Sequence, residues 1–220
     1  MNKKQESVFW EIIDIFYKEG LLPYIMIIGS WAEYIYSYYF KSNFTPNLRT
    51  RDLDFLYRNV RRPQNKINIT PKLIQNGFVY QEDPLTGVGK FHKENVLEIE
   101  FLTRSIGKGE NTTKIPSIGI TAESLRAVNL LADYPLELDC RDYIVTVPEP
   151  AAYILQKLYI NDKRKQEKQR KDIRAIRELL KHIKASTNDN VKLKTIFDEL
   201  HKNHQTVIIE AANKNFIDLL

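Results

Sequence analysis

Residues 24–57 read YIMIIGSWAEYIYSYYFKSNFTPNLRTRDLDFLY, and this stretch decides the fold of the chain. The apolar run Tyr24–Ile28 predicts a strand buried on both faces, and Gly29 permits a tight turn at its end. Apolar residues at helical spacing follow Ser30, and Arg51–Tyr57 predicts a second strand after a proline-containing loop. The expected order is therefore strand, turn, helix, loop and strand.

The second predicted strand carries two aspartates one residue apart, Asp52 and Asp54. Side chains alternate between the faces of a strand, so both carboxylates share one face, about 7 Å apart at the backbone. Leu53 and Phe55 then point into the core. Two carboxylates on an otherwise apolar strand repel each other and are costly unless a cation lies between them. Ligands that are all oxygen favour a hard cation, and Mg²⁺ is the first candidate.

The Gly29-Ser30 turn has two interpretations. In the structural one, Gly29 makes a tight turn and Ser30 caps the following helix, with Glu33 completing a capping box. In the functional one, the turn exposes free backbone N–H groups at a helix N-terminus, where a phosphate binds. A Gly-Ser pair alone favours the structural interpretation, and the aspartate pair that follows it strengthens the functional one.

A third informative strand is predicted at 96–103, which reads VLEIEFLT. Glu98 and Glu100 share one face of it, as Asp52 and Asp54 do on their strand. For Glu98 we favour an edge strand with one wet face. Glu100 is the better candidate for function, because a two-metal site needs a third carboxylate from a neighbouring strand. Arg51 adjoins the acidic pair and is a candidate contact for phosphate.

The rest of the chain predicts an exposed polar loop at 104–121, a short helix beginning at Thr121, and a last strand at Tyr143–Val147. Pro148-Glu-Pro150 then marks a break, and the later pattern is helical. We therefore expect an α+β domain at 1–148 and a helical domain at 149–220. The basic run within the second, Asn161–Lys171, is typical of a solvated helix face or of a nucleic-acid contact.

Composition narrows the class of protein. The 220 residues are 43% hydrophobic, ample for a packed core, and a net charge of +5 suits an anionic substrate such as a nucleotide or RNA. The single cysteine, Cys140, excludes an internal disulfide and favours a cytoplasmic location. The N-terminal residues lack the apolar core of a signal peptide, and no stretch is long enough to span a membrane.

Taken in order, Gly29-Ser30, Asp52-x-Asp54 and Glu100 resemble the DNA polymerase β-type nucleotidyltransferase superfamily. Within it, the chain looks most like uncharacterised bacterial and archaeal nucleotidyltransferases related to the toxin components of abortive-infection type II systems. Two later segments carry that closer resemblance, VPEPAAYILQKL at Val147–Leu158 and RKDIRAI at Arg170–Ile176. The resemblance implies a polymerase β-like mixed sheet flanked by helices and followed by a C-terminal helical domain.

The resemblance also implies roles for individual residues. Asp52, Asp54 and Glu100 would hold Mg²⁺ or Mn²⁺, and Gly29 and Ser30 would bind the nucleotide phosphates. In the toxin-like relatives a lysine and an aspartate lie near the nucleotide, and here they match Lys157 and Asp172. The implied reaction transfers a nucleoside monophosphate from an NTP to an acceptor hydroxyl and releases pyrophosphate. The acceptor is left open among RNA or tRNA, a protein and a small molecule.

Two other interpretations remain open. In the second interpretation, the chain is a non-catalytic nucleotide- or RNA-binding regulatory module of a toxin–antitoxin-like system. The basic run Lys163–Lys171 favours it. A binder of anions gains nothing from buried carboxylates, however, which argues against it. In the third interpretation, the carboxylates merely line a wet face of the sheet.

Overall fold

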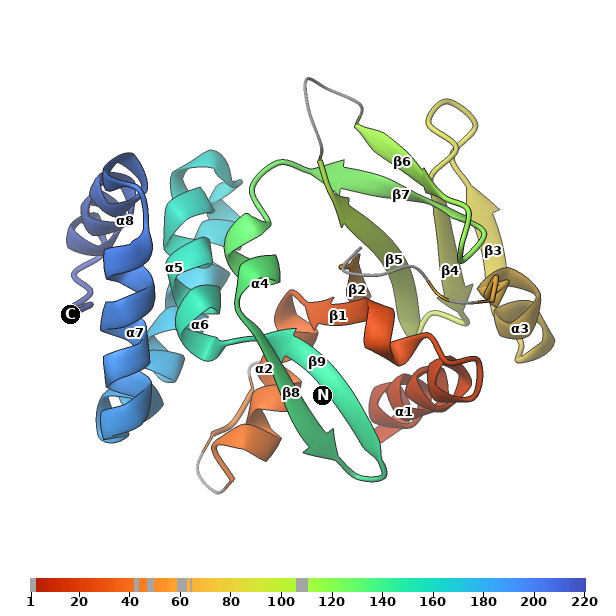
Figure 1. Ribbon diagram of the computed structural model, residues 1–220, viewed down its shortest axis with the longest axis horizontal. Coiled ribbons are helices and arrows are strands. Elements are labelled where there is room, and N and C mark those ends of the chain that lie inside the picture. The colour runs from red at the N-terminus through yellow and green to blue at the C-terminus, as the bar shows by residue number, and fades with distance from the viewer. Residues whose placement is uncertain (1–2, 42–43, 47–49, 59–62, 64, 106–110) are drawn as a thin grey trace.

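The computed structural model describes residues 3–41, 44–46, 50–58, 63, 65–105 and 111–220. Its centre is a seven-stranded mixed sheet, drawn on the right of Figure 1. The path through the sheet runs β1 (Ile25–Ile28), β2 (Asp52–Tyr57), β5 (Leu97–Arg104), β4 (Gly89–Lys93) and β3 (Val79–Glu82). β2 and β5 are parallel, whereas β1 pairs with β2, and β4 with β5, in antiparallel fashion.

The strands β6 (Thr112–Ile115) and β7 (Ile120–Leu125) complete this sheet, because β7 pairs in parallel with the last residues of β5. A separate two-stranded sheet joins β8 (Pro135–Cys140) to β9 (Tyr143–Pro148). Ile120 and Ala122 are both buried, which is the two-residue period of a strand, so the chain forms β7 at this point. The helix predicted from Thr121 is therefore wrong, and the predicted loop contains β6.

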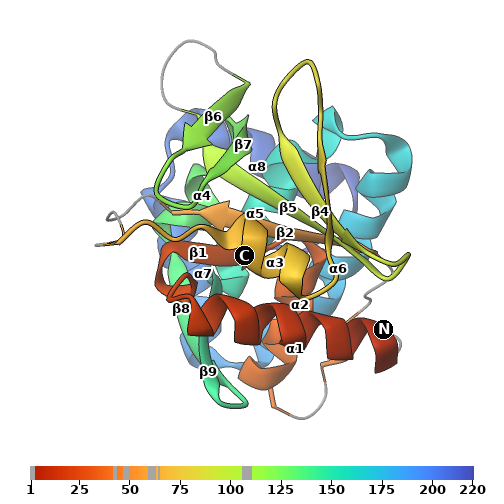
Figure 2. The ribbon, with the colours of Figure 1, turned by 90° about the vertical axis from the view of Figure 1, so that its right-hand side faces the viewer.

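One face of the main sheet is apolar and is covered by α1 (Lys3–Lys18), which runs below the strands β1, β2 and β5 in Figure 2. The ring of Phe16 packs 5.0 Å from that of Phe55 on β2 and 5.9 Å from that of Phe101 on β5, measured between ring centroids. Each fully buried ring stabilises the fold by roughly 2–3 kcal/mol. The carboxylates of β2 and β5 therefore lie on the opposite face of the sheet.

The second face of the sheet is polar around one cross-strand row. Asp54 pairs in register with Glu100, and Asp52 with Glu98, on the two parallel strands. Lys90 on β4 is the partner of Glu100 on the other side of β5. β5 therefore lies inside the sheet, between β2 and β4, and the interpretation of Glu98 as part of an edge strand is wrong.

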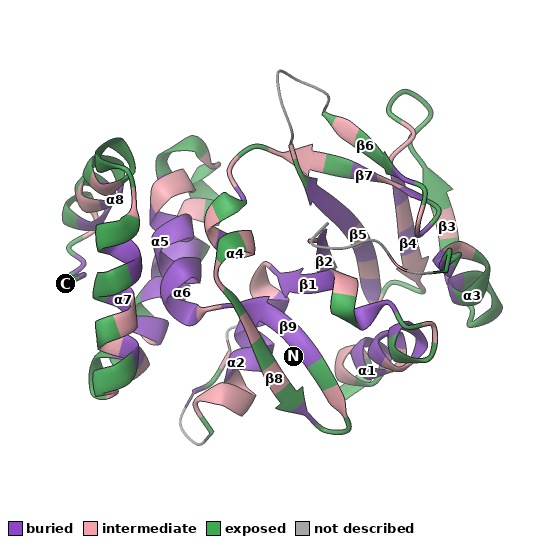
Figure 3. Cartoon of the chain, viewed as in Figure 1, coloured by how far each residue is buried: buried purple, intermediate pink, exposed green. Residues whose placement is uncertain are grey.

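Helices α5 (Pro150–Ile160), α6 (Gln166–Ala185), α7 (Thr187–Glu199) and α8 (Lys202–Lys214) follow the sheets, on the left of Figure 1. α5 is buried along most of its length, while α7 and α8 expose their outer sides (Figure 3). Shorter helices are α3 (Ile69–Gln75) and α4 (Asn129–Asp133). The expected α+β class is confirmed, and the division of the chain after residue 148 stays a prediction. None of the described helices is both long and apolar enough to cross a membrane.

Candidate nucleotide site

The turn between β1 and α2 (Ser30–Tyr39) is shaped by Gly29. Its φ of 65° lies in the region that favours glycine, and a Cβ added there would lie 2.5 Å from Oδ2 of Asp54. Gly29, not Ser30, is the residue that precedes the first turn of α2, so the predicted capping box is wrong. Gly29 therefore brings the start of α2 against the carboxylate of Asp54.

Asp52 and Asp54 lie on the same side of β2, as predicted. Asp52 is exposed and its backbone N–H donates to Oγ1 of Thr50 at 3.1 Å, whereas Asp54 is partly buried. Burial, and then the charges of Glu100 and Asp52, raise the pKa of Asp54 to about 7. The charges of Lys168 and Arg164 act in the opposite direction. The pair is thus held in the unfavourable arrangement that a bound cation would relieve.

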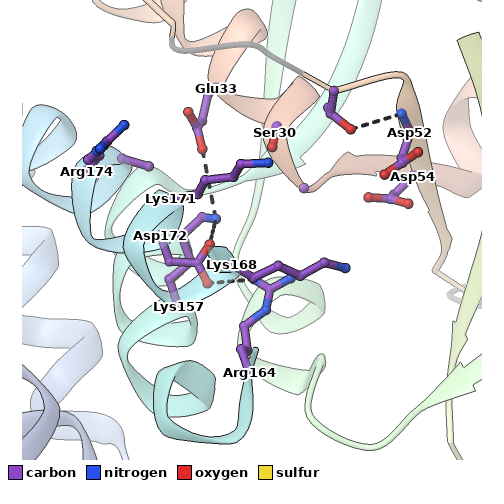
Figure 4. Close-up of a pocket in the computed structure, with 13 residues that line it drawn as sticks. Ser30, Glu33, Asp52, Asp54, Lys157, Arg164, Lys168, Lys171, Asp172 and Arg174 are labelled. Atoms are coloured by element: carbon purple, nitrogen blue, oxygen red, sulfur yellow. Dashed lines mark hydrogen bonds and ion pairs between the residues drawn. The ribbon is translucent and has the colours of Figure 1, made fainter. Parts of the chain in front are cut away.

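Both aspartates line a cavity of about 220 Å³ between the sheet and α6 (Figure 4). We call it the aspartate cavity. Gly29 and Ser30, for which a phosphate contact is predicted, form part of its wall. Five cationic side chains from α5, α6 and the segment between them form the opposite side, namely Lys157, Arg164, Lys168, Lys171 and Arg174. The cavity therefore has an acidic wall on β2 and a basic wall on the helices.

Lys157 and Asp172, predicted at the nucleotide, belong to a buried ion-pair network. Nζ of Lys157 lies 2.5 Å from Oδ1 of Asp172, and the guanidinium of Arg164 lies 2.7 Å from Oδ2 of the same carboxylate. Lys157 and Asp172 are 8% and 3% exposed, so this pair is shielded from solvent. Asp172 is therefore suited to a positioning role, because its carboxylate holds Lys157 and Arg164 in the wall of the aspartate cavity.

The network continues to the Gly29 turn through two residues that the sequence analysis did not select for function. Glu33 lies 3.9 Å from Nζ of Lys157, and burial raises its pKa although Lys157 and Tyr153 oppose the shift. The hydroxyl of Tyr153 lies 2.7 Å from Oε1 of Glu33 and 3.0 Å from the carbonyl of Gly29. Glu33, read from sequence as a capping residue, instead ties α2 to α5.

Lys168, Lys171 and Arg174 are the other functional candidates that sequence reasoning missed. Lys168 and Lys171 extend from α6 toward the aspartates in Figure 4. Lys171 pairs with Glu167 on the surface at 3.0 Å, and no ion pair to Lys168 or Arg174 is found in the described part of the chain. Their spacing of three residues within the basic run was the available signal, because it places them along one side of a helix.

Glu100, the predicted third carboxylate, is engaged elsewhere. Its Oε1 lies 2.5 Å from Nζ of Lys90, and the same ammonium lies 3.0 Å from Oε1 of Glu98. Burial raises the pKa of Glu100, and the neighbouring Lys90 opposes that shift. Among the described residues, no three His, Cys, Asp or Glu side chains are grouped closely enough to hold a metal ion. Asp52 and Asp54 offer oxygen ligands of the kind that Mg²⁺ and Mn²⁺ prefer, whereas Glu100 is paired with Lys90.

Arg51, the remaining candidate for phosphate, is exposed and does not line the aspartate cavity. Its guanidinium donates to the carbonyl of Asn95 at 3.4 Å, in the turn before β5. The structure thus brings together Gly29, Ser30, Asp52, Asp54, Lys157 and Asp172, and it leaves Arg51 and Glu100 outside that group.

A mixed sheet that presents Asp-x-Asp beside a Gly-Ser turn, opposite a basic helix, has the form of a nucleotidyltransferase. The chain belongs to a nucleotidyltransferase family, whose model, described as "Nucleotidyltransferase", matches residues 9–198. General nucleotidyl transfer is therefore its chemistry, with a nucleotide as substrate. No curated protein matches the chain.

Two solved structures are similar to this chain at low identity. An antigenic nucleotidyltransferase-like protein from Paracoccidioides brasiliensis is 14% identical, with 85% of this chain and 84% of that chain covered and a TM-score of 0.43. The lincosamide antibiotic adenylyltransferase LnuA, bound to lincomycin, is 15% identical, with 81% of this chain and 96% of that chain covered and a TM-score of 0.43.

Proposed function

We propose that this protein transfers a nucleoside monophosphate from an NTP to an acceptor hydroxyl and releases pyrophosphate, with Asp52, Asp54 and Glu100 as ligands of Mg²⁺ or Mn²⁺. The observation that carries the proposal is the opposition of the aspartate pair and the basic helix wall across one cavity. A bound triphosphate would suit both walls, because divalent cations would lie between it and the aspartates while its other side faces the cationic side chains. Lys168, Lys171 and Arg174 then contact phosphate oxygens from the other side.

In this reaction the acceptor oxygen forms a bond to the α-phosphorus, and the bond from that phosphorus to the bridging oxygen breaks. The bonding electrons leave with pyrophosphate, whose added charge Lys168 and Lys171 stabilise. Divalent ions, when bound, neutralise phosphate charge and favour loss of the hydroxyl proton. In this proposal one carboxylate of the aspartate pair accepts the proton that the acceptor hydroxyl loses. The absence of a side chain at Gly29 leaves room for the carboxylate of Asp54 beside the turn.

The network behind the cavity supports the same reaction through positioning. Asp172 holds Lys157 and Arg164, and Tyr153 joins their helix to the Gly29 turn. The two walls of the cavity are thereby held at a defined separation, as in-line transfer requires. We also propose, on the segments Val147–Leu158 and Arg170–Ile176, kinship with abortive-infection type II toxin components. The single cysteine, which is buried, is the basis for proposing a cytoplasmic location.

The test is transfer of label from each of the four NTPs, labelled at the α-phosphate, to a cell extract in the presence of Mg²⁺ or Mn²⁺. Asp54→Asn abolishes transfer in this proposal, and Asp139→Asn, an exposed aspartate on β8, serves as the matched control. Lys168→Ala with Lys171→Ala weakens NTP binding by about tenfold or more. Exposed Lys194→Ala on α7 leaves that binding unchanged. Transfer by Asp54→Asn at the parent rate would refute the mechanism.

A non-catalytic regulatory module is the second candidate, and one observation favours it. Glu100 is paired with Lys90, and no three acidic, His or Cys side chains among the described residues are grouped closely enough to hold a metal ion. In that case calorimetry detects NTP binding that is independent of Mg²⁺ and unaffected by Asp54→Asn, and no label is transferred. Metal-dependent NTP binding would exclude this candidate.

A further inference from the structure

A second cavity, of about 480 Å³, lies on the same sheet and shares no lining residue with the aspartate cavity. We call it the β4 cavity, because Lys90 and His92 of β4 form its floor together with Glu98 of β5. Glu82 and Asp83, from the end of β3, and Glu123 of β7 stand around it. Its volume lies within the range of sites for small molecules, about 300–1,000 Å³.

The β4 cavity begins next to the reaction centre. Glu98, which lines it, is the register partner of Asp52, which lines the aspartate cavity. Neighbouring strands are about 4.8 Å apart, so a molecule in the β4 cavity reaches the aspartate pair across one strand spacing. In the adjacent row, Glu100 is the register partner both of Asp54 and of Lys90, which lines the β4 cavity. An acceptor hydroxyl delivered along this row meets the α-phosphate from the side opposite the basic helix wall.

The two cavities carry opposite charge. In the aspartate cavity, five cations face Glu33, Asp172 and the aspartate pair, and the pair itself is assigned to metal. In the β4 cavity, four carboxylates face the single ammonium of Lys90, which is already bound to Glu98 and Glu100. The carboxylate of Glu123 has no partner within the described residues. An NTP is repelled from the β4 cavity and a phosphodiester backbone equally so, whereas a cation is attracted.

His92, in the floor of the β4 cavity, is a further polar group. Its Nδ1 lies 3.4 Å from Oε2 of Glu98, and its Nε2 is buried without a hydrogen-bond partner among the residues that the structure describes. A buried ring nitrogen without a partner costs free energy that a bound hydroxyl or amine can recover. The cavity therefore offers both charge and hydrogen bonding to a polar occupant.

We infer that the β4 cavity binds the acceptor, and that this acceptor is a small molecule carrying a hydroxyl group and at least one positively charged amine. The inference rests on the proposed function and names the substrate class of that same site. The amine pairs with Glu82, Glu123 or both, and the hydroxyl points along β5 toward Asp54. RNA is excluded as acceptor by the negative charge of this cavity, even though the basic face of α6 attracts polyanions.

The experiment divides an extract into three acceptor pools: small molecules retained by a cation exchanger, small molecules that pass through it, and total RNA. Each pool is incubated with α-labelled NTP, Mg²⁺ and the full chain. Label in the cationic pool supports the inference. Label in RNA or in the neutral pool overturns it and leaves the proposed function standing. No label in any pool, with no NTP binding by calorimetry, overturns the proposed function and the inference with it.

Variants then connect the acceptor to the cavity. Glu82→Gln with Glu123→Gln raises KM for the cationic pool about tenfold or more and leaves KM for NTP unchanged. Glu137→Gln, an exposed glutamate on β8, is the matched control and changes neither constant. Because Glu82 and Glu123 are exposed, their loss leaves the fold intact, which circular dichroism checks. An unchanged KM for the cationic acceptor in the double variant would overturn the assignment of the cavity.

Discussion

Nζ of Lys90 lies 2.5 Å from Oε1 of Glu100, so the third predicted metal carboxylate is bound to an internal cation. The two residues are register partners on β4 and β5, and the same ammonium also contacts Glu98. The lysine is 41% exposed at its side chain and Glu100 is 22% exposed, so solvent and salt weaken the pair. The ammonium of Lys90 would therefore compete with a divalent cation for the carboxylate of Glu100.

Removing Lys90 is therefore expected to improve metal binding. Lys90→Met should tighten Mn²⁺ binding about fivefold, the equivalent of roughly 1 kcal/mol for a partly exposed ion pair. Glu100→Gln should weaken it, and in the Glu100→Gln background the effect of Lys90→Met should shrink, which calorimetry of all four proteins measures. Lys93→Met is the control, since Lys93 is on the same strand but binds Glu11. Weaker Mn²⁺ binding by Lys90→Met would show that Lys90 supports the metal site.

Gly29 is expected to tolerate no side chain, for two separable reasons. Gly77→Ala measures the first alone, because Gly77 has a φ of 80° and open space around it. That cost is about 1 kcal/mol in the free energy of unfolding. Gly29→Ala should cost more and also weaken NTP binding, because its Cβ meets Asp54. Adding Asp54→Ala should recover stability in urea titrations; equal losses in the two alanine variants would contradict the close contact.

The raised pKa of Asp54 predicts how stability depends on pH. Its carboxyl moves from an ordinary 3.8 to about 7 on folding, so the native state keeps a proton that the unfolded chain has lost. This contribution is fully present below about pH 4, declines as the pH rises to about 7, and is absent above that. Without metal, Asp54→Asn should be more stable than the parent at pH 8, by on the order of 4 kcal/mol, and equally stable at pH 4.

The measurement is urea unfolding of both proteins across this pH range in the presence of a chelator. Asp139→Asn, which removes an exposed aspartate, should show no pH-dependent difference from the parent. A difference between the parent and Asp54→Asn that stays constant from pH 4 to pH 8 would contradict the assigned pKa. Adding Mn²⁺ at pH 8 should stabilise the parent and not Asp54→Asn.

Variants of the buried ion pair of Lys157 and Asp172 distinguish a role in stability from a role in NTP binding. Asp172→Asn should lower the free energy of unfolding by about 3 kcal/mol, because it leaves two cations without their carboxylate. Asp162→Asn breaks an exposed pair with Lys214, 2.7 Å apart, and should cost less than about 1 kcal/mol. Lys157→Met combined with Asp172→Asn should regain stability but not NTP affinity. If it regains both, the predicted role of Lys157 at the nucleotide is wrong.

What could be predicted from the sequence is local in origin. Asp52 and Asp54 share a face because any strand alternates its side chains, and Gly29 marks a turn because few other residues adopt its φ. Both features follow from a few consecutive residues. The α+β class follows in the same way from the apolar strand runs and the later helical spacing.

What could not be predicted depends on contacts between distant segments. Lys168 and Lys171 have the same pattern as a solvated helix face, and only the packing of α6 opposite β2 directs them toward the aspartates. Lys90 meets Glu100 because β4 pairs with β5, which no local signal announces. Glu33 fits a helix cap by its spacing, yet the hydroxyl of Tyr153 on α5 engages it instead. The charge partners of the site were therefore beyond the reach of sequence patterns.

The two walls of the aspartate cavity are also separated in time. The aspartates of β2 leave the ribosome well before Lys157 to Arg174, which come from the later helices. At a synthesis rate of about 5–20 residues per second, the cations that oppose the carboxylates are made several seconds after them. Every newly made molecule thus passes through a stage with only the acidic half of its site, and docking of α6 on the sheet is the step of biogenesis that completes it.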